Sequence, residues 1–163
     1  MSHPHNTPPA SQVWLTPPGI LEALGPFDLD PAAPASRPWE IAARHITETE
    51  DGLSSEWDGM VWLNPPYHRN GIPKWMERMA EHGRGFAMVF ARTETVWFQR
   101  SVFGAADGVL FLAGRIRFHL RDGELAPNNC GASPVIAAYG PEALERLRLA
   151  VARGQLQGRL VML

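Results

Sequence analysis

The sequence has few of the residues that mark disulfide-rich, zinc-binding or membrane proteins. Cys130 is its only cysteine, so the chain can form neither an internal disulfide nor a cysteine-based zinc site. No apolar stretch is long enough to cross a membrane. Lys74 is the only lysine, so almost all of the basic charge is arginine. These absences favour a protein of the reducing cytoplasm and exclude a disulfide scaffold.

Length and composition predict one small domain. A chain of 163 residues with 45% hydrophobic content can bury a real core. Residues 1–12 show no periodicity and lack the apolar core of a signal peptide, so we expect a flexible tail there and one domain over residues 13–163. His3 and His5 have no acidic or cysteine partner nearby, and we expect them to be solvated rather than metal ligands.

Apolar runs and turn signals alternate along the chain in a way that is typical of an α/β fold. Strands are expected near 27–30, 46–51, 60–63, 85–91, 109–112, 134–139 and 155–163, and helices near 17–24, 73–82, 96–103 and 141–153. The order predicts a three-layer sandwich with a mostly parallel, Rossmann-like sheet.

The tetrapeptide Asn64-Pro65-Pro66-Tyr67 directly follows the apolar run 60–63, which we expect to be a strand. In an open α/β sheet, ligands bind just beyond the carboxyl ends of the strands, so the tetrapeptide lies where a ligand site is expected. The carbonyls of the Asn64 side chain and the Pro65 main chain can accept both N–H groups of a planar amine, and the prolines hold these acceptors rigid. Tyr67 offers an aromatic face on which a flipped-out base can stack. The alternative is an ordinary turn that closes a buried strand.

Two carboxylates follow expected strands in the same way. Asp30 precedes a proline turn and Asp51 precedes Gly52. Both are candidates for binding polar groups of a nucleoside cofactor, since the carboxyl ends of parallel strands meet at one edge of a sheet.

Five sequence blocks occur in an order that resembles the phage-type DNA N6-adenine methyltransferases, which are Dam-like enzymes. The blocks are Trp14-Leu15-Thr16-Pro17, Leu29-Asp30-Pro31-Ala32-Ala33, Asp51-Gly52-Leu53 followed by Trp57, Val61-Trp62-Leu63-Asn64-Pro65-Pro66-Tyr67, and Ala91-Arg92-Thr93-Glu94-Thr95-Val96-Trp97-Phe98. The resemblance implies the fold of S-adenosylmethionine-dependent methyltransferases and methyl transfer to adenine N6 in double-stranded DNA. It also implies a place in a bacterial host or phage-infected cell, and protection of phage DNA against restriction.

The same resemblance implies a role for each block. The residues matched to the catalytic block are Asn64, Pro65, Pro66 and Tyr67. Those matched to the S-adenosylmethionine site are Trp14, Thr16, Pro17, Asp30, Pro31, Ala32, Asp51 and Leu53. The glycine-rich turn of the wider superfamily is replaced here by a Pro-Ala-Ala sequence, a form that the phage-type group shares.

The net charge of −2 does not predict DNA binding, but the distribution of arginine does. Arg115, Arg117 and Arg121 alternate with apolar residues, so on a strand they would share one face and contact the DNA backbone. The sequence 122–123 then predicts a hairpin turn. The alternative is the solvated face of an edge strand. Arg92 directly follows the strand 85–91, and we expect it to contact DNA phosphate or support the catalytic loop.

Several alternatives stay open from the sequence. The accepted amine could be cytosine N4, an RNA base or a protein glutamine, or the chain could bind cofactor or DNA without catalysis. Trp14 and Trp62 could wall a pocket or pack in the core. Cys130 is expected to lie far from the catalytic block, so we expect direct transfer without a covalent enzyme intermediate.

Overall fold

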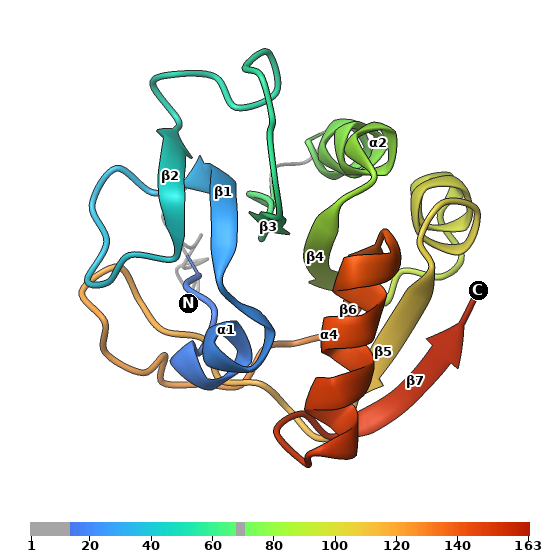
Figure 1. The fold of residues 1–163 in the computed structure, drawn as a ribbon. Coiled ribbons are helices and arrows are strands. Elements are labelled where there is room, and N and C mark those ends of the chain that lie inside the picture. The colour runs from blue at the N-terminus through green and yellow to red at the C-terminus, as the bar shows by residue number, and fades with distance from the viewer. Residues whose placement is uncertain (1–13, 68–70) are drawn as a thin grey trace, which may run out of the picture.

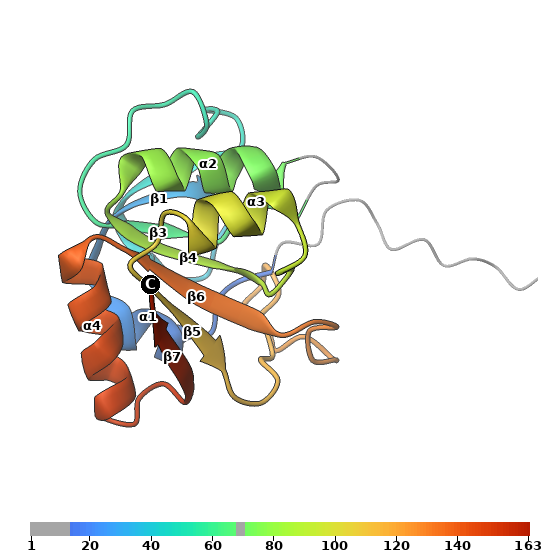
Figure 2. The ribbon, with the colours of Figure 1, turned by 90° about the vertical axis from the view of Figure 1, so that its right-hand side faces the viewer.

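The computed structural model describes residues 14–67 and 71–163, and the tail expected at 1–12 lies outside this range. One seven-stranded sheet is covered by helices on both faces (Figures 1 and 2). The strands are β1 (Phe27–Ala33), β2 (Ala42–Thr47), β3 (Val61–Leu63), β4 (Gly85–Phe90), β5 (Gly108–Leu112), β6 (Pro134–Tyr139) and β7 (Gly158–Met162). The helices are α1 (Pro18–Leu24), α2 (Ile72–His82), α3 (Val96–Phe98), which continues as the π-helical turn η1 (Gln99–Phe103), and α4 (Pro141–Ala152).

The sheet is mixed, so the prediction of a mostly parallel, Rossmann-like sheet is not confirmed. The strand order is β2-β1-β3-β4-β6-β5-β7, and the first four strands in this order run parallel. Strand β6 runs antiparallel to both β4 and β5, and β7 runs antiparallel to β5. The physical reason is the connection of residues 113–133, which contains no helix, because a strand that returns without a helical crossover pairs antiparallel. The expected three-layer α/β arrangement is confirmed.

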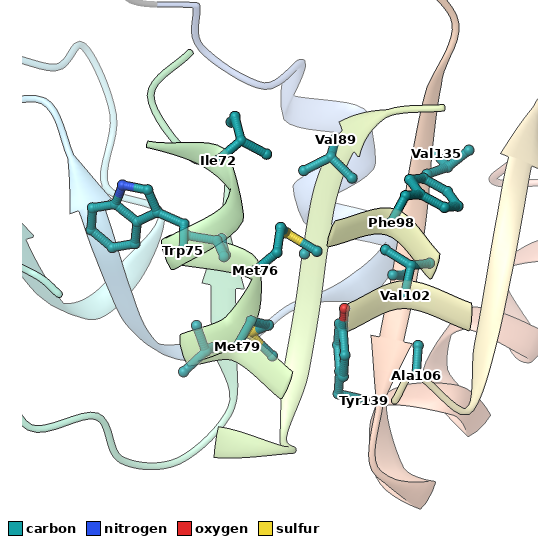
Figure 3. Close-up of a cluster of buried hydrophobic side chains, with 14 of the residues drawn as sticks. Ile72, Trp75, Met76, Met79, Val89, Phe98, Val102, Ala106, Val135 and Tyr139 are labelled. Carbon is teal, nitrogen blue, oxygen red and sulfur yellow. The ribbon is translucent and has the colours of Figure 1, made fainter. Parts of the chain in front are cut away.

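Each face of the sheet carries its own hydrophobic core. Successive residues of β3 point to opposite faces, so Val61 and Leu63 join the core under α2 while Trp62 joins the core under α1 and α4. Figure 3 shows the first core, where Met76 and Met79 of α2 lie beside the side chains of α3 and η1. The strands in the middle of the sheet are therefore buried on both sides, which fixes β3 and the residues that follow it.

The helix ends follow local sequence signals with one exception. Helix α2 has Pro73 in its first turn and ends at Gly83, whose φ is 69°. Thr95 caps α3, since its side chain accepts a hydrogen bond from the Phe98 N–H. The exception is α1, whose N-cap residue is Pro17 and which has no side-chain cap. The hydroxyl of the preceding Thr16 faces Asn64.

The carboxyl ends of β3, β4 and β5 and the amino end of β6 meet at one edge of the sheet, because Phe90 at the end of β4 pairs with Pro134 at the start of β6. The β5–β6 loop, residues 113–133, and the segment before α1 lie at this edge (Figure 2). None of the helices in the described residues is long and apolar enough to span a membrane.

The strand expected at 115–121 does not form, so that prediction is wrong. His119 makes only isolated bridges, to Leu15 and to Leu125. The segment has no long neighbouring strand with which to build a ladder. The predicted turn is confirmed, because the Gly123 N–H donates to the Leu120 carbonyl at 2.9 Å and Gly123 has a φ of 89°.

Candidate active site

Asn64 directly follows β3, and its amide is held in one orientation. The amide nitrogen Nδ2 donates to the Trp14 carbonyl oxygen at 2.8 Å and lies 3.4 Å from the Thr16 hydroxyl oxygen. The amide oxygen Oδ1 accepts no hydrogen bond from residues 14–67 or 71–163. A half-buried carbonyl oxygen with free lone pairs can accept an incoming N–H group.

The rest of the tetrapeptide is anchored to the end of β4. The Tyr67 ring lies 4.7 Å from the Phe90 ring, and the Phe90 N–H donates to the Tyr67 hydroxyl oxygen at 3.1 Å. Pro65 is buried, whereas Tyr67 is 42% exposed. One side of the Tyr67 ring is thus supported by the protein while much of the residue is open to a planar partner.

Asp30 is a buried carboxylate with a single hydrogen bond from the described chain. It is 4% exposed, and its Oδ1 accepts from the Ala32 N–H at 3.1 Å. Burial raises the pKa of Asp30 from an ordinary 3.8 to about 7, although the Ala32 N–H and the positive charge of Arg37 oppose the rise. An ionised Asp30 is therefore short of a cationic partner.

The sequence placed a strand end at Asp30, but β1 continues through Pro31 and Ala32 to Ala33. The register between β1 and β2 shifts between Asp30 and Ala33. Pro31 has no N–H, and a strand tolerates proline at such an irregularity because no ladder hydrogen bond is lost there. The alternation of apolar and polar residues in the sequence therefore ends at Asp30, whereas strand β1 continues to Ala33.

The turn that carries Asp51 packs against the end of β1. A Cβ atom on Gly52 would lie 1.9 Å from the Pro31 carbonyl oxygen, so only glycine fits this contact. The Trp57 indole N–H donates to the Gly52 carbonyl at 2.7 Å. Asp51 itself is exposed, has a φ of 54° and accepts from the Ser54 hydroxyl at 2.7 Å. Two of the blocks matched to the cofactor site are thus in direct contact.

The remaining residues matched to the cofactor site lie on the same elements. Leu53 and Ala32 are half-buried and pack against the core under α2. Pro17 is half-buried at the start of α1. The structure therefore brings one group of these residues to the end of β1 and another to the segment beside Asn64.

Three arginines of the β5–β6 loop carry charge that no carboxylate of the described residues neutralises. Arg121 is exposed and makes no hydrogen bond there. Arg115 donates to the Cys130 carbonyl and Arg117 to the Ala126 carbonyl, so both guanidinium groups hold the returning arm of the loop. The alternation of exposed arginines with covered apolar residues is confirmed, although the backbone is not a strand.

Arg92 lies at the same edge, two residues after β4. Its Nε donates to Glu94 at 2.8 Å, and both side chains are 61% exposed. Arg92 would have to leave this ion pair to contact a phosphate, which sets it apart from Arg121.

Cys130 lies on the β5–β6 loop, which returns to the end of β4 before β6 begins, since Pro134 pairs with Phe90 and the Ala91 N–H donates to the Ser133 carbonyl. Burial raises the pKa of the Tyr67 phenol, and the Phe90 N–H, which donates to the phenol oxygen, opposes this rise. That Cys130 takes no part in the reaction stays a prediction.

No group of three or more His, Cys, Asp or Glu residues in the described chain could hold a metal ion. Trp62 is fully buried between Phe27 and Phe86, so it packs in the core. Trp14 is half-buried, with its ring edge against Phe118 at 6.2 Å. The ends of β1 and β3 thus carry a buried carboxylate and a fixed amide whose oxygen accepts no hydrogen bond from the described residues, and polar groups at this edge are typical of ligand-binding sites in α/β proteins.

The chain belongs to the DNA N-6-adenine-methyltransferase (Dam) family, whose model matches residues 5–141. The DNA N-6-adenine-methyltransferase of Escherichia phage T1 is 32% identical over 111 residues. This alignment covers 63% of the chain and 46% of the phage protein, so the chain spans about half the length of the relative it matches. No solved structure matches the chain significantly.

Proposed function

We propose that this protein transfers a methyl group from S-adenosylmethionine to N6 of adenine in DNA, with the base turned out of the duplex. Family membership supports the reaction class. The observation that carries the proposal is the orientation of Asn64, whose amide nitrogen donates to the Trp14 carbonyl while its amide oxygen accepts no hydrogen bond from the residues that the structure describes.

The tetrapeptide provides the acceptors for this chemistry. The adenine amino group is a poor nucleophile because its lone pair is delocalised into the ring. Asn64 Oδ1 and the Pro65 carbonyl oxygen accept its two N–H groups as positive charge develops on nitrogen, which lowers the barrier electrostatically. Tyr67 provides the face on which the base stacks, with Phe90 behind it.

The residues at the end of β1 fit S-adenosylmethionine. This cofactor carries a sulfonium, which supplies the electrophilic methyl group, and an ammonium group. Asp30 is a buried carboxylate that accepts one hydrogen bond from the described residues and has a raised pKa. A cation stabilises such a carboxylate, so we assign the ammonium group to Asp30. The other assigned cofactor residues are Trp14, Thr16, Pro17, Pro31, Ala32, Asp51 and Leu53.

The β5–β6 loop is the proposed DNA contact. Arg115, Arg117 and Arg121 lie on the loop that returns to the end of β4, where Tyr67 is held by Phe90, and guanidinium groups bind phosphate well. Arg92 is proposed as a secondary contact because Glu94 already binds it. The proposed setting is the cytoplasm of a bacterial host or a phage-infected cell, where such methylation would protect phage DNA against restriction.

The test is a transfer assay with the purified chain, S-adenosylmethionine and unmethylated double-stranded DNA, followed by mass analysis of the nucleosides. We expect N6-methyladenine. Parallel reactions with RNA and with cell extract distinguish the alternatives, because N4-methylcytosine, a methylated RNA base or methylglutamine would each replace this proposal. Cofactor and DNA binding without any methylated product would identify a catalytically inactive relative.

A further inference from the structure

Residues 14–16 form a strap between the β5–β6 loop and the proposed catalytic amide. At the centre of the strap, the Leu15 N–H donates to the His119 carbonyl at 2.8 Å, and the His119 N–H donates to the Leu15 carbonyl at 2.9 Å. The Trp14 ring packs edge-on against Phe118 at 6.2 Å. The strap is therefore joined to the loop by two reciprocal backbone hydrogen bonds and an aromatic contact.

On its other side the strap holds Asn64. The Trp14 carbonyl and the Thr16 hydroxyl, on either side of Leu15, both face the Asn64 amide nitrogen. Leu15 is 3% exposed and Thr16 is 1% exposed, so water cannot easily replace these contacts. The positions of His119 and Asn64 are thus linked through a three-residue segment of which Leu15 and Thr16 are buried.

The strap also selects which end of the Asn64 amide faces outward. If the amide were flipped, its oxygen would face the Trp14 carbonyl oxygen, and two acceptors would meet without a proton between them. The observed orientation instead leaves Oδ1 without a hydrogen bond from residues 14–67 and 71–163. Catalysis by Asn64 needs an acceptor at this position, so the orientation set by the strap is the one the reaction requires.

The loop end of the strap is itself fixed. The His119 ring nitrogen Nδ1 lies 2.8 Å from the Gly123 carbonyl oxygen, and because a carbonyl only accepts, Nδ1 carries the proton. The His119 ring packs edge-on against Trp39 at 5.3 Å. His119 therefore holds the tip of the hairpin against the β1–β2 connection while its backbone holds Leu15.

We infer that residues 14–16 are a positioning element for Asn64, and that His119 keeps this element in place. His119 contacts neither the adenine nor the methyl donor in the proposed reaction. Turnover nevertheless depends on His119, because a displacement of about 1 Å in a reacting group can reduce the rate by up to about a hundredfold. This inference rests on the proposed function and adds to it a residue that acts through Asn64.

The kinetic test compares three variants at saturating cofactor and DNA. His119→Ala loosens the hairpin, and Thr16→Val removes the hydroxyl that faces the Asn64 amide. Glu124→Ala is the control, because the exposed Glu124 side chain lies on the same hairpin and makes no hydrogen bond within the described residues. We expect kcat to fall about tenfold in His119→Ala and Thr16→Val, with the dissociation constant for S-adenosylmethionine in His119→Ala within about twofold of wild type. Glu124→Ala is expected to turn over normally.

A second measurement needs no catalysis. In isotope-labelled protein, the side-chain amide signal of Asn64 is assigned by its absence in Asn64→Ala, and exchange of its protons with water is followed. We expect slow exchange in wild type and in Glu124→Ala, and faster exchange in His119→Ala.

The outcomes separate this inference from the proposed function. Wild-type kcat in both His119→Ala and Thr16→Val would overturn the positioning role, as would a His119→Ala variant that only weakens cofactor binding. Equal amide exchange in wild type and His119→Ala would overturn it as well. If amide exchange of Asn64 is slow in wild type and faster in His119→Ala, but wild type never methylates adenine, the proposed function is wrong. The positioning of Asn64 by residues 14–16 would still hold.

Discussion

The two ends of the Asn64 amide have different roles. The nitrogen donates a hydrogen bond to the Trp14 carbonyl, which fixes the side chain, and the oxygen can accept a hydrogen bond at the edge of the sheet. The sequence predicted the acceptor from the tetrapeptide and its place after a strand. It could not predict the contact with Trp14, because the two residues are 50 positions apart and only the folded chain brings them together.

We predict that Asn64→Ala reduces methyl transfer by at least about a hundredfold, because removing one electrostatic contact to a transition state costs roughly that much. The fold should survive, since Asn64 is only half-buried. Transfer assays measure the loss, and a thermal shift with S-adenosylmethionine checks that cofactor binding remains. Normal transfer in this variant would remove Asn64 from the catalytic role.

We predict that Asp30→Asn stabilises the cofactor-free protein at alkaline pH. Because the folded pKa of about 7 exceeds the ordinary 3.8, the folded state binds more protons than the unfolded state between these values. Stability is therefore lost as pH rises through this window, by about 4 kcal/mol for a shift of this size.

Thermal unfolding at pH 5 and pH 8 tests this expectation. The gain of Asp30→Asn over wild type should be larger at pH 8, and the variant should bind S-adenosylmethionine more weakly. Asp28→Asn is the control, because Asp28 lies on the same strand but is exposed. A variant that binds cofactor normally would contradict the assignment of Asp30.

We predict that Cys130→Ser retains methyl transfer within about twofold of wild type. Transfer to an exocyclic nitrogen needs no enzyme nucleophile, because the sulfonium supplies the electrophile. The backbone contacts of Cys130, from its N–H to Ile116 and from Arg115 to its carbonyl, do not involve the thiol. A folded but inactive Cys130→Ser protein would instead indicate a covalent step and a different reaction.

At the scale of the elements, the contact between the Gly52 turn and β1 assembles the proposed cofactor site. The sequence indicated a turn at Gly52, but not that the turn rests on the Pro31 backbone. For β6, the sequence predicted the bounds 134–139 correctly but not the direction of the strand. A strand that is buried on both faces is apolar throughout, so its residues do not indicate which neighbour it pairs with or in which direction.

We predict that Gly52→Ala destabilises the protein by about 1–3 kcal/mol and weakens S-adenosylmethionine binding. Its Cβ would overlap the Pro31 carbonyl oxygen, which is backbone and cannot move aside freely. Denaturant unfolding and a cofactor titration measure the two effects. Gly19→Ala is the control, because a Cβ there meets nothing within 4 Å on helix α1. Equal stability of both variants would show that the turn can shift to accommodate the added methyl group at little cost.

At the scale of the whole molecule, a net charge of −2 conceals an uneven distribution. Seven arginines form ion pairs within the described chain: Arg37, Arg44, Arg78, Arg84, Arg92, Arg146 and Arg148. The loop arginines are not among them. The sequence predicted their shared exposure from alternation alone, whereas the ion pair of Arg92 emerged only from the fold.

We predict that Arg121→Ala weakens DNA binding and lowers the salt dependence of the affinity by about 0.9 in the log–log slope, the value for one phosphate contact. Arg100→Ala is the matched control, since it removes the same charge from an exposed position on η1, outside the β5–β6 loop. Titrations of duplex DNA at several salt concentrations measure both. Identical slopes in the two variants would exclude the loop as the DNA contact.

The position of β6 between β4 and β5 affects how the protein can be made. As the nascent chain leaves the ribosome, β1 to β4 emerge first and can pair with one another, yet the free side of β4 has no neighbour until residues 134–139 follow. Strand β5 emerges earlier than β6 but cannot join the sheet without it. Synthesis that stops before Pro134 would thus release a half-sheet with an unpaired apolar edge, a species prone to aggregate.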